Sequence, residues 1–232
     1  MYINPSARSW TCETSIDPNV LNFHRCLPGY AVTPLTSLPD LAKELGLGNV
    51  FVKDESSRFG LPAFKILGAS WAIYRAVAAR AGLPLTVSLK ELGDAARLKE
   101  IRLVSCSEGN WGRSVAKMAQ YLGVPATIYV PRYMDQATQT KIRSEGAEIV
   151  VVNGEYDDSI SSSRDDAEKT GALLVLDTSW KGYEEIPKVI SRTFLIYDSL
   201  IASSGLQRVT RLCSQRWTSR CNSSLESQSR WQ

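Results

Sequence analysis

The chain has 232 residues, 44% hydrophobic and 22% charged, which is the composition of a globular protein with a sizeable core. Its net charge of +3 arises near the end of the sequence, because residues 201–232 hold five arginines and one acid, Glu226. The first 200 residues carry the remaining 22 basic and 23 acidic side chains, and this nearly neutral body argues against a nucleic-acid-binding face.

Hydrophobic runs and cysteines narrow the class of protein further. No apolar run approaches the roughly 18 residues that span a bilayer, and the N-terminal residues contain no signal-peptide core. The cysteines are scattered without a CxxC pair, which predicts reduced thiols in the cytoplasm and argues against a metal site or a disulfide framework. The five are Cys12, Cys26, Cys106, Cys213 and Cys221.

The first hundred residues contain few regular segments. Residues 35–48 (LTSLPDLAKELGLG) predict a capped helix that a glycine ends, and residues 49–55 (NVFVKDE) predict a strand. An alanine-rich helix is expected over 66–81, and residues 82–100 indicate helix and loop without a chemical signature.

From about residue 100, strands and helices alternate. Short apolar runs predict strands at 101–105, 126–130, 147–152 and 172–176, and the segments between them have helical spacing and end in glycines. Four strands separated by three helices predict βαβ crossovers, hence an α/β fold with an open parallel sheet. After about Leu200 the sequence has eight serines and few aliphatic residues, which predicts disorder.

Two motifs carry possible chemistry. Lys65 lies in RFGLPAFKILGAS at the start of an apolar helix, where it is either a surface lysine with a buried stem or an amine kept for covalent chemistry. The turn at 105–114 (SCSEGNWGRS) joins a strand to a helix, and its backbone amides suit a carboxylate. Its glycine spacing matches neither the dinucleotide-binding nor the P-loop pattern, which argues against NAD and ATP.

In order along the chain, several segments resemble diaminopropionate ammonia-lyase over about residues 22–190. They are FHRCLPGYAVTPLTSLPDLAKELGLGNVFVKDESSRFGLPAFKILGAS, SEGNWGRSVAKMAQYLG, GAEIVVVNGEYDD and LDTSWKGYEEIP. That family has the type II, tryptophan synthase β-like fold of enzymes that use pyridoxal 5'-phosphate. The resemblance implies a large domain that begins at 1–66, a small α/β domain at 67–185, and a remnant of the large domain with a basic tail at 186–232. It also implies a homodimer for the complete enzyme.

The resemblance assigns the cofactor residues. Lys65 matches the lysine that binds pyridoxal phosphate covalently, and Phe64 matches an aromatic residue that packs near the cofactor. Asn110 matches the asparagine that hydrogen-bonds the 3′-oxygen of the pyridine ring.

The substrate residues follow from the same resemblance. Ser107, Gly109, Asn110 and Trp111 match the loop that closes on the substrate carboxylate, although Trp111 replaces the usual histidine. Glu108 and Asp177 match two aspartates that act as bases for the two enantiomers, and Glu108 is one methylene longer. The implied reaction is β-elimination on 2,3-diaminopropionate or a similar amino acid, giving pyruvate and ammonia. A serine/threonine dehydratase-like lyase and a catalytically inactive binding module remain the alternatives.

Simpler explanations stay open for several of these residues. Glu108 could be a solvated turn carboxylate, and Asp177 could cap the turn that follows it. Three further groups are expected to be structural: His24, the helix-capping cluster Tyr156, Asp157 and Asp158, and the packing pair Trp180 and Tyr183.

The resemblance fades after about residue 190. In this fold a glycine-rich loop holds the cofactor phosphate, but the only glycine beyond Gly182 is Gly205. We therefore expect a truncated or mis-spliced product, or else a shortened paralogue, with impaired cofactor binding.

Overall fold

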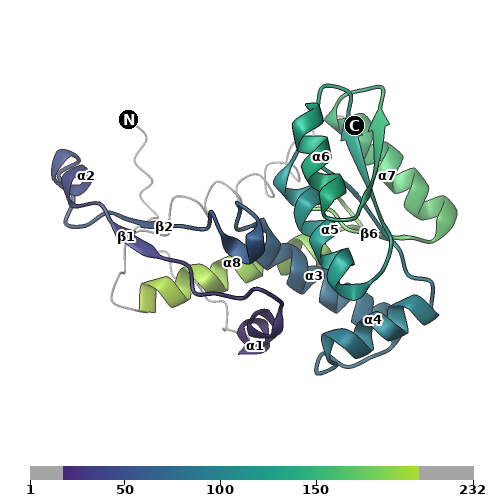
Figure 1. The fold of residues 1–232 in the computed structure, drawn as a ribbon, viewed down its shortest axis with the longest axis horizontal. Helices are drawn as coiled ribbons and strands as arrows, with labels where there is room; N and C mark the ends of the chain where they lie inside the picture. The colour runs from purple at the N-terminus through teal and green to yellow at the C-terminus, as the bar shows by residue number, and fades with distance from the viewer. Residues whose placement is uncertain (1–17, 204–232) are drawn as a thin grey trace.

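The computed structural model of the chain describes residues 18–203, which form eight α-helices, one short 3-10 helix and six strands (Figure 1). The helices are α1 (Pro18–Cys26), α2 (Pro39–Glu44), η2 (Arg58–Gly60), α3 (Lys65–Ala81), α4 (Leu89–Leu98), α5 (Asn110–Leu122), α6 (Gln136–Ser144), α7 (Tyr156–Thr170) and α8 (Glu185–Ser203). The strands are β1 (Leu35–Ser37), β2 (Phe51–Lys53), β3 (Leu103–Cys106), β4 (Ala126–Pro131), β5 (Glu148–Val152) and β6 (Leu173–Leu174).

Four strands form the predicted parallel sheet, in the order β5-β4-β3-β6. Crossover helices α5 and α6 lie on one side of this sheet and α7 on the other (Figure 1), so the strand order reverses beside β3. The central strand β3 is buried along its whole length, as expected for a strand covered by helices on both faces. The α/β prediction is therefore confirmed. The carboxyl ends of β3 and β6 meet at one edge, which is where such sheets bind ligands.

Helix α3 is the centre of the packing. It contacts α8 and α5 extensively, and Ile66, Ile73 and Val77 on it are fully buried. Gly68 allows the closest approach, since a Cβ atom built there would lie 2.8 Å from side-chain atoms of Ile190 and Phe194 on α8. The alanine-rich sequence of α3 thus matches a helix with close neighbours on more than one side.

The prediction for residues 35–48 is wrong in part. Only Pro39–Glu44 is helical, and no side chain caps that helix. Residues 35–37 instead form β1, which pairs antiparallel with β2 so that Ser37 lies opposite Phe51. This two-stranded sheet and α2 lie at one end of the molecule, away from the parallel sheet (Figure 1).

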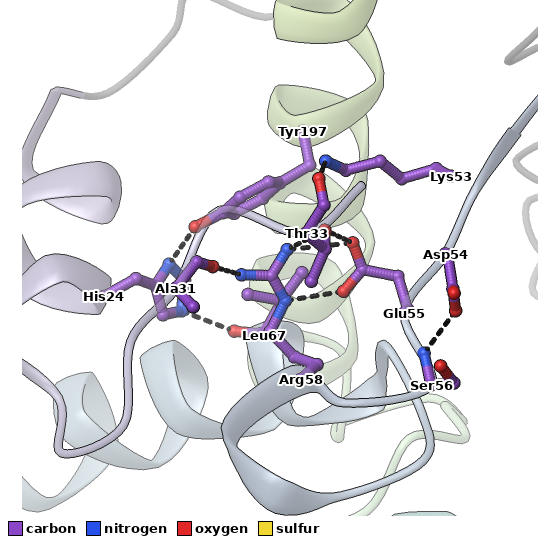
Figure 2. Close-up of polar contacts among 10 residues, drawn as sticks. All are labelled: His24, Ala31, Thr33, Lys53, Asp54, Glu55, Ser56, Arg58, Leu67 and Tyr197. Carbon is purple, nitrogen blue, oxygen red and sulfur yellow. Dashed lines mark hydrogen bonds and ion pairs between the residues drawn. The ribbon is translucent and has the colours of Figure 1, made fainter. Parts of the chain in front are cut away.

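A buried polar cluster anchors the base of the β1–β2 sheet (Figure 2). The guanidinium of Arg58 is 3% exposed and donates to both carboxylate oxygens of Glu55, to the Thr33 hydroxyl and to the Ala31 carbonyl. Glu55 in turn accepts from Thr33 at 2.7 Å. Burial raises the cost of the Glu55 charge, yet its hydrogen bonds with Arg58 and Thr33 outweigh that cost and lower its pKa.

His24 extends this cluster to α3 and α8 (Figure 2). Its ring is fully buried, with Nε2 donating to the Leu67 carbonyl at 2.9 Å and Nδ1 accepting from the Tyr197 hydroxyl at 2.8 Å. Because burial disfavours the charged ring and the Arg58 guanidinium repels it, the pKa of His24 falls from 6.5 to about 4. His24 lies among packing contacts, as predicted for a structural histidine.

Helix α8 continues beyond the point where the sequence pattern changes. It ends at Ser203, so the first residues of the segment expected to be disordered are helical. The remainder of that segment, residues 204–232, and Cys12 near the N-terminus lie outside the described residues.

Candidate active site

Lys65 and Asp177 form an ion pair at the carboxyl edge of the parallel sheet. Lys65 is the first residue of α3, and Asp177 follows β6 by three residues. The Lys65 ammonium lies 2.9 Å from Asp177 Oδ2, and the two side chains are 30% and 11% exposed. Lys65 is therefore a partly buried amine held by a carboxylate at a helix N-terminus, and it is not a freely solvated surface lysine.

Phe64 precedes this lysine as the N-cap residue of α3. Its side chain is 38% exposed, and its ring packs edge-on against Phe194 at a centroid distance of 5.0 Å. Contact with α8 thus fixes the Phe64 ring, which stays partly exposed.

The turn between β3 and α5 is organised by Ser107. Its hydroxyl is buried, accepts the backbone N–H groups of Gly109 (2.9 Å) and Gly112 (2.7 Å), and lies 3.2 Å from the Gly109 carbonyl. Asn110, the first residue of α5, is exposed. Ser107 therefore shapes the turn from inside, whereas Asn110 and the first amides of α5 are placed to meet a ligand.

Glu108 extends from the same turn toward β4. It is exposed and accepts a hydrogen bond from the Tyr133 hydroxyl, and this bond with the nearby carboxylate raises the pKa of Tyr133 to about 12. Glu108 is thus partnered by a surface tyrosine rather than by Lys65.

Trp111 differs from the sequence-based expectation. Its side chain is 3% exposed, and its indole N–H donates to the Ser105 hydroxyl at 3.0 Å, close to the Val175 carbonyl. The bulky ring packs into the core because Ser105 can satisfy its only donor there. This arrangement gives no support to the predicted contact between Trp111 and a substrate.

Tyr156 and Cys106 are neighbours of the site that sequence reasoning did not assign to it. Cys106 is fully buried at the end of β3, and burial raises its pKa to about 12, so it is an inert thiol. Burial, the Cys106 thiol and the charge of Asp177 raise the pKa of Tyr156. The sequence GEYDD contains a hint of this arrangement, because Tyr156 is the one aromatic residue in an otherwise acidic helix start.

The other residues of that segment behave as predicted. Glu155 is the N-cap of α7, and the Asp158 carboxylate accepts its backbone N–H at 2.7 Å, while Asp157 lies in the acidic first turn. Trp180 and Tyr183 pack against each other with centroids 4.5 Å apart.

Within residues 18–203, no group of three or more His, Cys, Asp or Glu side chains is arranged to hold a metal ion. In the same part of the chain, none of the helices is both long enough and apolar enough to cross a membrane.

The geometry and the comparisons define the class of protein. A sheet of this topology with a partly buried lysine at its carboxyl edge fits a cofactor aldehyde, and the sequence profile of pyridoxal-phosphate dependent enzymes matches residues 26–194. The chain belongs to this family, which confirms the predicted superfamily and its cofactor.

Particular relatives narrow the likeness. The chain is 39% identical over 189 residues to the diaminopropionate ammonia-lyase of Salmonella typhimurium strain LT2, an alignment covering 78% of this chain and 46% of the relative. It also superposes on the holo form of the Escherichia coli diaminopropionate ammonia-lyase with a TM-score of 0.75 and 35% identity, covering 82% of this chain and 48% of that one. A threonine deaminase from Solanum lycopersicum, 19% identical with a TM-score of 0.58, shares the fold. The chain thus spans about half the length of the relatives it matches.

Proposed function

We propose that this chain carries the lysine-bearing half of a pyridoxal-phosphate-dependent ammonia-lyase that acts on 2,3-diaminopropionate or a similar amino acid. The observation that carries the proposal is the Lys65–Asp177 pair, 2.9 Å apart at the carboxyl edge of the sheet. The relatives of greatest relevance are ammonia-lyases of this kind, and one was solved in complex with D-serine.

The residues present fit one end of the cofactor. Lys65 offers a partly exposed amine to an aldehyde, and Phe64 offers a ring surface beside it. Asn110 is exposed at the N-terminus of α5, where the positive end of the helix dipole lies. Lys65 would hold the cofactor, Phe64 would pack near it and Asn110 would hydrogen-bond it. When bound, pyridoxal phosphate supplies an electron sink for negative charge at the amino acid Cα.

The chain's own carboxylates would move the protons. Asp177 or Glu108 accepts the Cα proton of one or other enantiomer, and the β-ammonium group leaves as ammonia. The enamine that remains takes up water and gives pyruvate and a second ammonia. Ser107 holds the Gly109 and Gly112 N–H groups and so keeps the turn shaped, and the Asn110 amide at the start of α5 would receive the substrate carboxylate.

The experiment is reductive trapping followed by product analysis. Borohydride treatment of the purified chain with pyridoxal phosphate, with peptide mapping, should label Lys65; Lys65→Arg should abolish this label, and Lys90→Arg, on the exposed face of α4, should not. Labelling at other lysines with Lys65 unmodified would disprove the assignment. A survey of pyruvate and 2-oxobutyrate release from diaminopropionate, serine and threonine separates the ammonia-lyase from the dehydratase alternative. Trapping without any product would favour the binding module.

The remaining expectations belong to this proposal. We infer a cytoplasmic protein from the two cysteines within residues 18–203, both of which are free thiols, with Cys26 exposed and Cys106 buried. The domain boundaries near residues 66 and 185 and the homodimer of the complete enzyme stay predictions. Limited proteolysis and sedimentation analysis test them.

A further inference from the structure

We propose that Tyr183 is a positioning residue that fixes the Asp177 carboxylate beside Lys65. The inference deepens the proposed function, since it rests on Asp177 acting at the same site. It starts from the short length of β6, whose strand pairing with β3 ends at Leu174, three residues before Asp177. A carboxylate that must meet one amine needs its backbone held more firmly than the end of a two-residue strand provides.

Side chains complete the pairing beyond the end of β6. The Tyr183 hydroxyl donates to the Leu174 carbonyl at 3.0 Å and accepts the Leu176 N–H at 2.8 Å. Between these two residues, the Val175 N–H donates to the Val104 carbonyl at 2.8 Å. The Val175 carbonyl accepts from the Ser105 hydroxyl at 2.6 Å. A single phenol therefore binds the backbone on both sides of Val175, immediately before Asp177.

Tyr183 is itself held by its surroundings. Its ring stacks on Trp180 at an interplanar angle of 17°, and the Arg164 guanidinium lies 4.6 Å from the Trp180 ring on the α7 side. The Tyr183 N–H donates to the Trp180 carbonyl at 2.9 Å, and Gly182 closes this tight loop with φ = +93°. Because the Tyr183 ring and backbone are both held by these contacts, the Tyr183 hydroxyl has a fixed position. Its hydrogen bonds therefore fix the position of residues 174–176.

This matters most when Lys65 is engaged with another group. Within residues 18–203, Asp177 forms its ion pair with Lys65. Once the lysine is no longer a salt-bridge partner, the backbone alone decides where the Asp177 carboxylate lies. Tyr183 would then set the position of the proposed base without touching the substrate.

The test compares two tyrosines with the same kind of role. Tyr183→Phe removes a hydroxyl that binds two backbone groups near the site. Tyr74→Phe is the control. It removes a hydroxyl that lies 3.0 Å from the Leu85 carbonyl and 2.7 Å from the Val87 carbonyl, in a loop away from the Lys65–Asp177 pair. The probe is trace acetylation by acetic anhydride, with the acetylation rate of Lys65 measured relative to that of exposed Lys90. The Lys65 amine donates a hydrogen bond to Asp177 Oδ2 at 2.9 Å, which holds it in place, so Asp177→Asn should release the amine and accelerate acetylation of Lys65 about fivefold.

Tyr183→Phe should accelerate the acetylation of Lys65 about threefold, whereas Tyr74→Phe should leave it unchanged. In the Asp177→Asn background, Tyr183→Phe should add nothing, because it acts through that carboxylate. A wild-type rate for Tyr183→Phe, or the same acceleration in both backgrounds, would overturn the proposal. Because acetylation needs no cofactor, failure of pyridoxal phosphate to label Lys65 would count against the proposed function alone.

Discussion

The buried histidine makes the stability of this protein depend on pH in a window where few groups titrate. His24 has a pKa of about 4 in the folded chain, against 6.5 for an unperturbed histidine. It is also the only histidine in the sequence. Since the folded value is the lower one, the unfolded chain binds the proton first as the pH falls. The stabilisation is therefore complete above pH 6.5 and is lost progressively between pH 6.5 and pH 4.

The size of the effect follows from the shift. A difference of about 2.5 units corresponds to about 3 kcal/mol over the whole window, and about 2 kcal/mol of it is lost between pH 7 and pH 5. The Glu55 carboxylate, whose pKa is lowered, contributes in the same direction but mostly below its ordinary value of 4.5. Arg58, the charged group that most disfavours a cation at His24, stays protonated throughout.

Urea unfolding followed by circular dichroism at pH 7 and pH 5 measures this loss. The variant His24→Gln keeps a side chain that can donate and accept but cannot titrate. It should be less stable than the wild type at pH 7 yet change little between the two pH values. An equally large loss on acidification in His24→Gln would show that another group is responsible, and a wild-type protein without any loss would refute burial of a neutral ring.

Two glycines should not tolerate a methyl group. Gly68→Ala places a Cβ 2.8 Å from Ile190 on α8 and should cost about 1–3 kcal/mol, whereas Gly48→Ala, with open space around it, should not destabilise the chain. Gly112→Ala places a Cβ 2.8 Å from the Ser107 Cβ and should cost a similar amount by displacing the hydroxyl that shapes the β3–α5 turn. Thermal denaturation of the three variants tests both expectations, and wild-type stability of Gly68→Ala or Gly112→Ala would contradict the packing described.

The parallel sheet could be predicted from sequence because its signals are local. Each strand is a short apolar run, and the helices between them end in glycines such as Gly123 and Gly171, which have φ = +65° and +71°. The β1–β2 pair could not be predicted in this way. Residues 35–37 form a strand only because they pair with residues 51–53. The residues around them have helical spacing, so the sequence pattern predicts a helix there instead.

For the site, too, local features could be predicted from sequence and contacts between distant residues could not. Lys65 and Asp177 are 112 residues apart, and only the resemblance to a family could bring them together before the structure did. Side-chain direction was beyond both kinds of reasoning. The turn containing Trp111 was identified correctly, but whether the indole faces a ligand or the core depends on Ser105, which lies on another element.

The anchoring of Arg58 has a consequence for motion within the molecule. The β1–β2 sheet has two strands of three residues, and Val32 and Val52 beside and within it are 82% and 46% exposed. Such a sheet gains little from burial and should open repeatedly while the rest stays folded. Opening cannot easily spread past Arg58, because releasing its partners would leave a buried charge unpaired. Amide hydrogens of residues 35–53 should thus exchange with solvent on a much shorter timescale than those of β3 and β4, with the guanidinium as the boundary between the two regimes.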